Sequence, residues 1–249
     1  MRHADREIRS VSDLIQHLKA DRLADQPLWF RGQSNAAWNL VPSLARCGGV
    51  QAELTLFKRF KQNALPFMMH RPQSEWEWLF IMQHHGLPTR LLDWTESPLV
   101  ALYFIVTDPS VTAQSEQGAL WALLPLELNK ASKFQVRFKN DIPGFGDDEH
   151  LDSYLPSKLA LQQAAYGPLA AIALRNNPRI QVQQGVFTVC HIELSPLEGD
   201  GNVQYLWRYV VPADAKANIR AELEMLNISK LSLFPELANV SEHARGFLS

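Results

Sequence analysis

The stretch over residues 83–104 limits most strongly how this chain can fold, because it crowds ionisable side chains between two apolar helical patterns. Polar groups this dense are costly to bury unless they are paired or used in function. A solvated loop would seldom carry Leu91, Leu92 and Trp94 through its middle. The stretch therefore predicts a partly buried turn, held by its own hydrogen bonds, in which a functional site could lie. The side chains that mark this turn are His84, His85, Thr89, Arg90, Asp93, Trp94 and Thr95.

Helix signals flank this stretch on both sides. Ser74 is suited to cap a helix that ends at Gly86. Ser97 and Pro98 form an N-cap and a first helical position, which predicts an apolar helix over residues 99–106. Apolar residues at helical spacing predict further helices, which follow Ser10 and cover residues 51–66, 217–226 and 231–240.

Short apolar runs predict the strands, and these fall mostly in the second half of the chain. The run at residues 28–30 stops before Gly32, which places Arg31 at the end of an early strand. The other predicted strands cover residues 118–124, 169–174, 185–192 and 205–211. Helices before the middle and strands after it favour an α+β fold, with helices around a small mixed or antiparallel sheet. No repeat or long linker divides the sequence, so residues 1–249 are expected to form a single domain.

Composition limits the compartment and the partners. The formal net charge of -2 argues against a general nucleic-acid-binding protein, and Lys58, Arg59 and Lys61 are expected to form a solvated helix face. Cys47 and Cys190 form no Cys-x-x-Cys pair and indicate a reducing compartment. The polar N-terminus does not resemble a signal peptide, and the longest apolar run is far shorter than the roughly 20 residues that cross a bilayer. We therefore expect a cytoplasmic protein without membrane contact.

Four blocks of the sequence resemble the FRG domain family. The first is Phe30-Arg31-Gly32-Gln33, the central block spans residues 83–104, and the later blocks are residues 179–187 and 233–237. The similarity extends from about Ser10 to the C-terminus. The resemblance implies a fold similar to that of the family but indicates no particular reaction. Bacterial members of the family imply stand-alone cytoplasmic proteins or modules connected with defence against phage.

The order of these blocks also has a weaker similarity to the motif layout of the ADP-ribosyltransferases. That superfamily places an arginine or histidine on an early strand, a serine or threonine before a helix, and a glutamate on a later strand. Arg31, Thr95 and Gln184 stand at these places. The similarity implies NAD as a substrate, with no bound cofactor, and the Arg31 guanidinium on its pyrophosphate. Gln183 and Gln184 depart from the pattern because neither offers a carboxylate, which leaves Asp93 as the nearby acid.

The predicted site joins these positions. Arg31 holds an anionic group, while Asp93 orients a base or a hydroxyl. Thr95 and Gln184 form hydrogen bonds with a ribose or with the nicotinamide amide. These four are the predicted catalytic residues. The predicted ligand-binding residues are Arg31, Gln33, His84, Arg90 and Trp94.

Other interpretations of the same residues remain open. The chain could be a binding module without catalysis, whose partner is a nucleotide, a peptide or another protein. A metal hydrolase could use His84, His85 and Asp93, but adjacent histidines on a helix point about 100° apart, so we predict no metal site. Asp93 could also be purely structural, paired with Arg90 or with Arg31. Asp93 therefore either pairs with Arg31 or faces an open cleft.

An acidic, glycine-containing segment at residues 140–149 is expected to be a mobile loop that could cover such a cleft.

Overall fold

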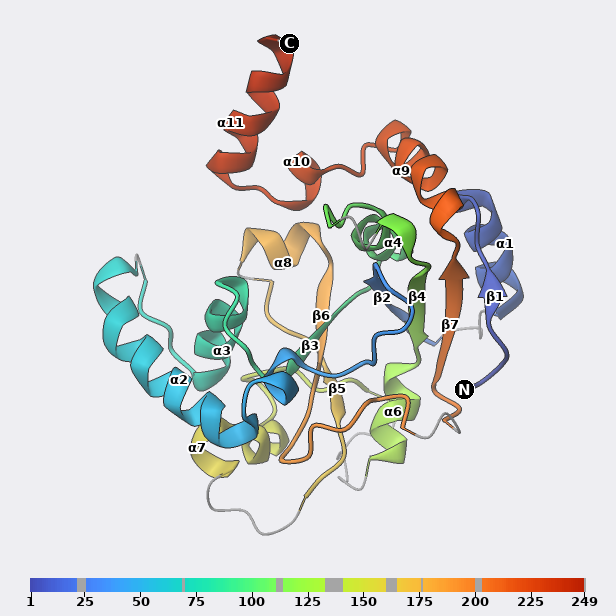
Figure 1. Cartoon of the computed structure of the whole chain (residues 1–249). Coiled ribbons are helices and arrows are strands. Elements are labelled where there is room, and N and C mark those ends of the chain that lie inside the picture. Colours follow the sequence, from blue (N-terminus) through green and yellow to red (C-terminus); the bar gives the residue numbers. More distant parts are fainter. Residues whose placement is uncertain are drawn as a thin grey trace.

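A computed structural model of the chain describes residues 1–21, 26–68, 70–110, 114–132, 141–159, 165–175, 177–199 and 203–248. Its strands join in one sheet, and its helices pack around that sheet (Figure 1). The strands are β1 (Arg6–Glu7), β2 (Trp29–Gln33), β3 (Leu91–Thr95), β4 (Gly118–Leu123), β5 (Leu169–Ala171), β6 (Gly185–Val189) and β7 (Leu206–Val211). They pair in the order β1-β7-β4-β2-β3-β6-β5, parallel between β1 and β7 and antiparallel elsewhere. The predicted α+β class, with helices around a mixed sheet, is confirmed.

The helices include those predicted, except that the one predicted over residues 231–240 is divided into two by a break at residues 234–236, and several short helices are added. The α-helices are α1 (Val11–Asp21), α2 (Gly49–Ala64), α3 (Glu75–His84), α4 (Pro98–Val106), α6 (Pro125–Ala131), α7 (Pro156–Leu159), α8 (Pro178–Val182), α9 (Lys216–Met225), α10 (Lys230–Leu233) and α11 (Leu237–Arg245). The 3₁₀ turns are η1 (Ser43–Arg46), η2 (Leu65–Phe67), η3 (Glu149–Tyr154), η4 (Ala213–Ala215) and η5 (Gly246–Leu248). Among these helices, none combines the length and the apolar character that crossing a bilayer would require.

Side-chain caps fix the two helices that precede and follow β3. The Ser74 hydroxyl accepts a hydrogen bond from the backbone of Glu77 at 3.2 Å and so begins α3. Gly86 takes a φ of +77° just after this helix, a conformation that glycine adopts at low cost. Ser97 caps α4, whose first position is Pro98. These predicted boundaries are confirmed.

Residues 91–95 form strand β3 rather than the predicted polar turn. β3 pairs with β6 along its whole length. Leu91 is buried on one face of the sheet, while Leu92 and Trp94 are buried on the other. A strand buried on both faces does not alternate between apolar and polar residues. The sequence pattern therefore did not distinguish it from an apolar turn.

Strand β2 continues past Arg31, so this residue lies within the strand and not at its end as predicted. β2 pairs with β4 at five positions but with β3 at only one, where Phe30 lies opposite Thr95. β2 and β3 therefore diverge beyond this pair, and the sheet opens between its two halves. Helix α4 lies so close to β2 that a Cβ at Gly32 would stand 1.9 Å from a backbone oxygen of the helix. This close approach requires glycine.

Three groups of buried apolar side chains hold the sheet and the helices together. The first packs α1, α4 and α9 against β2, β4 and β7. The second packs α2 and α3 against β3, β5 and β6. The third covers the opposite face of the sheet and includes Trp29, Trp94 and Trp121. On one face, each half of the opened sheet thus has its own helical cover.

The acidic loop is anchored by an aromatic side chain. Residue 140 lies outside the described residues. Phe145 is 3% exposed, and the centroid of its ring lies 4.6 Å from that of Trp76. Its backbone N–H donates to the carbonyl of Ile172, which follows β5, at 2.9 Å. Residues 141–149 do not line the cleft described next.

Candidate functional site

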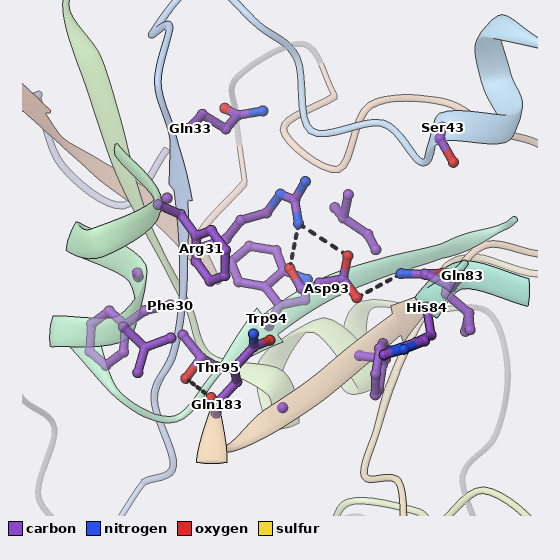
Figure 2. Close-up of a pocket in the computed structure, with 18 of the residues that line it drawn as sticks. Phe30, Arg31, Gln33, Ser43, Gln83, His84, Asp93, Trp94, Thr95 and Gln183 are labelled. Carbon is purple, nitrogen blue, oxygen red and sulfur yellow. Dashed lines mark hydrogen bonds and ion pairs between the residues drawn. The ribbon is translucent and has the colours of Figure 1, made fainter. Parts of the chain in front are cut away.

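A cleft of about 1020 Å³ opens where β2 and β3 diverge (Figure 2). It is lined by β2, β3, the connection after β2, the end of α3 and parts of α4 and α8. Its apolar walls include Phe30, Phe80, Leu87, Leu91, Trp94, Phe104 and Phe187. Its ionisable lining consists of Arg31, Arg46, His84, Asp93, Asp108 and Arg179. Three arginines face two carboxylates, so the cleft favours an anionic ligand.

Arg31 reaches from β2 into the open angle between the strands. Its Nη1 donates to the backbone oxygen of Asp93 at 2.6 Å, which bridges the two halves of the sheet. Its Nε is buried and has no hydrogen-bond partner among the described residues. Burial lowers the pKa of Arg31, and the Asp93 carboxylate acts in the opposite direction. An unpaired buried N–H costs about 1–3 kcal/mol, which an acceptor on a ligand would offset.

Asp93 contacts Arg31 and also faces the cleft. Its side chain is 62% exposed, and its Oδ2 stands 4.0 Å from Nη1 of Arg31. Gln83, in the last turn of α3, donates from Nε2 to Oδ1 of Asp93 at 2.6 Å. The Gln83 amide oxygen in turn accepts a hydrogen bond from the buried hydroxyl of Thr89. This chain of hydrogen bonds fixes the direction of the carboxylate, and Figure 2 shows its link from Gln83 to Asp93.

Thr95 is committed to holding β3 against the chain before β6. Its hydroxyl donates to the backbone oxygen of Gln183 at 2.6 Å and accepts from the backbone of Ser97 at 3.0 Å. Gln183 lines the cleft, whereas Gln184 is exposed and does not. Gln184 takes a φ of +47° at the turn into β6. The structure therefore brings Gln183 to the cleft, and not Gln184, which was the predicted site residue.

Gln33 and Trp94 line the cleft, but their polar groups form hydrogen bonds within the protein. The Gln33 amide oxygen accepts from the indole of Trp121 at 2.7 Å, and its Nε2 donates to the carbonyl of Asn39 at 3.3 Å. The Trp94 indole donates to the hydroxyl of Thr188 at 3.1 Å. Both side chains therefore contribute to the shape of the cleft, while the donors and acceptors named here are bonded within the protein.

His84 lines the cleft at the end of α3. Burial lowers its pKa, Arg179 and His85 lower it further, and Glu236 acts in the opposite direction. The rings of His84 and His85 lie 5.0 Å apart between centroids at 88° to each other. Among the described residues, no group of three histidine, cysteine, aspartate or glutamate side chains could hold a metal ion.

Arg90, predicted to bind the ligand, lies outside the cleft and is fully buried. Its Nε donates to the Glu53 carboxylate at 2.6 Å. Its two terminal nitrogens donate to the backbone oxygens of Cys190 and Tyr154 at 2.9 and 2.6 Å. The guanidinium therefore links buried segments of the interior. Arg90 neither lines the cleft as a ligand-binding residue nor pairs with Asp93, and both predictions were wrong.

Sequence reasoning assigned no role to several residues that the fold brings to the cleft. Arg46 ends η1, and Arg179 lies in α8. Gln83 completes the set through its bond to Asp93. Gln83 and Arg179 belong to sequence blocks already noted, which is the one signal that marked them.

Comparison with known proteins gives one match. Residues 26–114 match the model of the FRG domain family. This segment contains β2, η1, α2, α3, β3 and α4, and so most of the cleft. No curated protein and no solved structure matches the chain significantly.

Proposed function

Because the chain carries an FRG domain over residues 26–114, we propose that this domain binds a nucleotide or NAD in the cleft between β2 and β3. The observation that carries the proposal is the buried Nε of Arg31, which has no partner among the described residues. A guanidinium forms parallel hydrogen bonds with phosphate oxygens, and these are stronger than bonds between neutral groups. The aromatic walls of the cleft provide the apolar surface that a base or nicotinamide ring needs.

The arrangement of the strands supports an ADP-ribosyltransferase-like use of this ligand. β3 lies between β2 and β6, so Arg31, Thr95 and Gln183 come from three adjacent strands or their ends. In such a reaction the bond between nicotinamide and ribose breaks, and nicotinamide leaves with the bonding electrons. The acceptor forms the new bond to the ribose carbon and releases its proton to the solvent. Asp93, held by Gln83, is the carboxylate positioned to stabilise the positive charge on the ribose.

A non-catalytic module is the second function that the cleft supports. Gln183 and Gln184 provide no carboxylate at the entrance of β6, and the Gln183 amide donates to the backbone oxygen of Leu233. The cleft would then bind its ligand without turnover and transmit occupancy to a protein partner. A role in defence against phage, which the family resemblance implies, belongs to this alternative. Consumption of NAD with time favours the enzyme, while saturable binding without product favours the module.

The direct test replaces Arg31. We expect Arg31→Gln to weaken binding of NAD or ADP-ribose about 10- to 100-fold in calorimetry, the loss of one or two charge-assisted hydrogen bonds. Arg59→Gln is the matched control, because Arg59 is exposed on α2 and does not line the cleft. Thermal unfolding of each variant verifies that it is folded. Equal affinities in the wild type and Arg31→Gln, or no binding by the wild type, would contradict the proposal.

A further inference from the structure

A second arginine, supplied by the connection between β2 and α2, enters the same cleft. Arg46 is the last residue of η1 and lines the cleft together with Arg31. The ion pairs found among the described residues do not include Arg46. Its side chain is exposed, and it takes no part in the hydrogen bonds described above between β2, β3 and the chain before β6. Its charge is therefore available to a ligand.

The charges of Arg31 and Arg46 are close enough to affect each other. Burial is the largest cause that lowers the pKa of Arg31, and the charge of Arg46 lowers it further. Asp93 raises this pKa by more than Arg46 lowers it, but its Oδ2 stands 4.0 Å from Arg31 and its Oδ1 accepts from Gln83. Among the described residues, no carboxylate forms an ion pair with Arg46. Two guanidinium groups that face one space are stabilised by an anion between them. The cleft thus has a place for more negative charge than Asp93 supplies.

We propose that Arg31 and Arg46 together hold a diphosphate group, one guanidinium on each phosphate. The inference rests on the proposed function and narrows its ligands to nucleoside diphosphates and dinucleotides, in preference to monophosphates. A monophosphate forms its hydrogen bonds with one guanidinium and adds little binding free energy at the other. A diphosphate presents oxygens to both, and it supplies an acceptor to the unpaired Nε of Arg31.

Trp38 gives this diphosphate a neighbouring surface for a base. It lies in the same connection as Arg46, lines the cleft and is 52% exposed, an unusual exposure for a tryptophan. An aromatic ring stacks on any base, with a contribution of about 1–3 kcal/mol. The diphosphate and the base of a nucleotide would therefore both contact residues of the β2–α2 connection.

The experiment compares phosphates of different length. Calorimetry with AMP, ADP, NAD, inorganic phosphate and pyrophosphate is run on the wild type, Arg31→Gln, Arg46→Gln and Arg59→Gln. We expect the wild type to bind ADP about tenfold more tightly than AMP, the gain of a second charge-assisted contact. Arg46→Gln should bind ADP and AMP with similar affinities, and Arg59→Gln should behave as the wild type does.

The outcomes separate this inference from the proposed function. NAD binding by Arg46→Gln with an unchanged preference for ADP over AMP overturns the diphosphate role and leaves the proposed function intact. Binding of pyrophosphate that both Arg31→Gln and Arg46→Gln abolish upholds the arginine pair even if no nucleotide binds. Absence of binding by every phosphate overturns both.

Discussion

The carboxylate of Asp93 owes its position to a neighbour that lies ten residues earlier. Gln83 uses both ends of its amide, since its oxygen accepts from Thr89 and its nitrogen donates to Asp93. An amide held at one end has no freedom to turn, so the other end directs the carboxylate. Thr89 is fully buried, and Asp93 is not. The interior of the protein thus orients an exposed charge through one side chain.

Replacement of Gln83 by leucine should show how much the hydrogen bonds of Thr89, Gln83 and Asp93 contribute to the stability of the fold. The buried Thr89 hydroxyl loses its acceptor, so we expect the free energy of unfolding to fall by about 1–3 kcal/mol in urea denaturation. Thr89→Val removes the stranded hydroxyl, and the double variant should therefore recover part of this loss. Gln51→Leu, an exposed glutamine on α2, is the control and should change little. Equal stability of Gln83→Leu and the wild type would contradict the role of the amide.

At the scale of elements, local signals predicted the helices, whereas the cleft depends on pairing that the sequence does not reveal. Ser74, Ser97 and Gly86 act within a few residues of their positions, so their roles were predicted and are confirmed. Strand β3 was missed because it is buried on both faces. The divergence of β2 from β3 is a property of two strands and their separate helical covers. For the same reason, the sequence could suggest a role for Arg31 but could not predict that Arg46 lines the same cleft.

The C-terminal segment supports the α8 wall of the cleft. The ring of Phe234 lies 4.7 Å from the Arg179 guanidinium and 6.0 Å from the ring of Phe104. The carbonyl of Leu233 accepts from Gln183 at 3.0 Å. Loss of these contacts leaves α8 with less to hold it.

Phe234→Ala should therefore loosen α8 and weaken binding at the cleft. Loss of the cation–π contact with Arg179 and the edge-to-face contact with Phe104 should cost about 1–2 kcal/mol locally. We expect hydrogen exchange at residues 179–184 to accelerate about 5- to 30-fold, the same free energy expressed as a ratio. Phe247→Ala is the control, because that ring is 78% exposed. Unchanged exchange in α8, or equal effects of both variants, would remove the supporting role of Phe234.

At the scale of the whole molecule, one buried cation joins segments that are distant in the sequence. Arg90 contacts Glu53 in α2, the end of η3 through Tyr154, and the residue after β6 through Cys190. These partners lie 37, 64 and 100 residues from Arg90. Arg90 directly precedes β3, so the same contacts set where β3 enters the sheet. No short-range spacing could have predicted Glu53 as its partner.

Removal of the charge on Glu53 should therefore destabilise the whole fold. Glu53→Gln leaves the Arg90 guanidinium buried without its counter-charge, and breaking such a pair costs about 3–5 kcal/mol. We expect the midpoint of urea denaturation to fall accordingly, with the slope of the transition unchanged. Glu127→Gln removes a glutamate from the surface pair with Lys130, and it should cost less than about 1 kcal/mol. If the two variants lost similar stability, Arg90 would not be the central junction of this fold, and its burial would need another explanation.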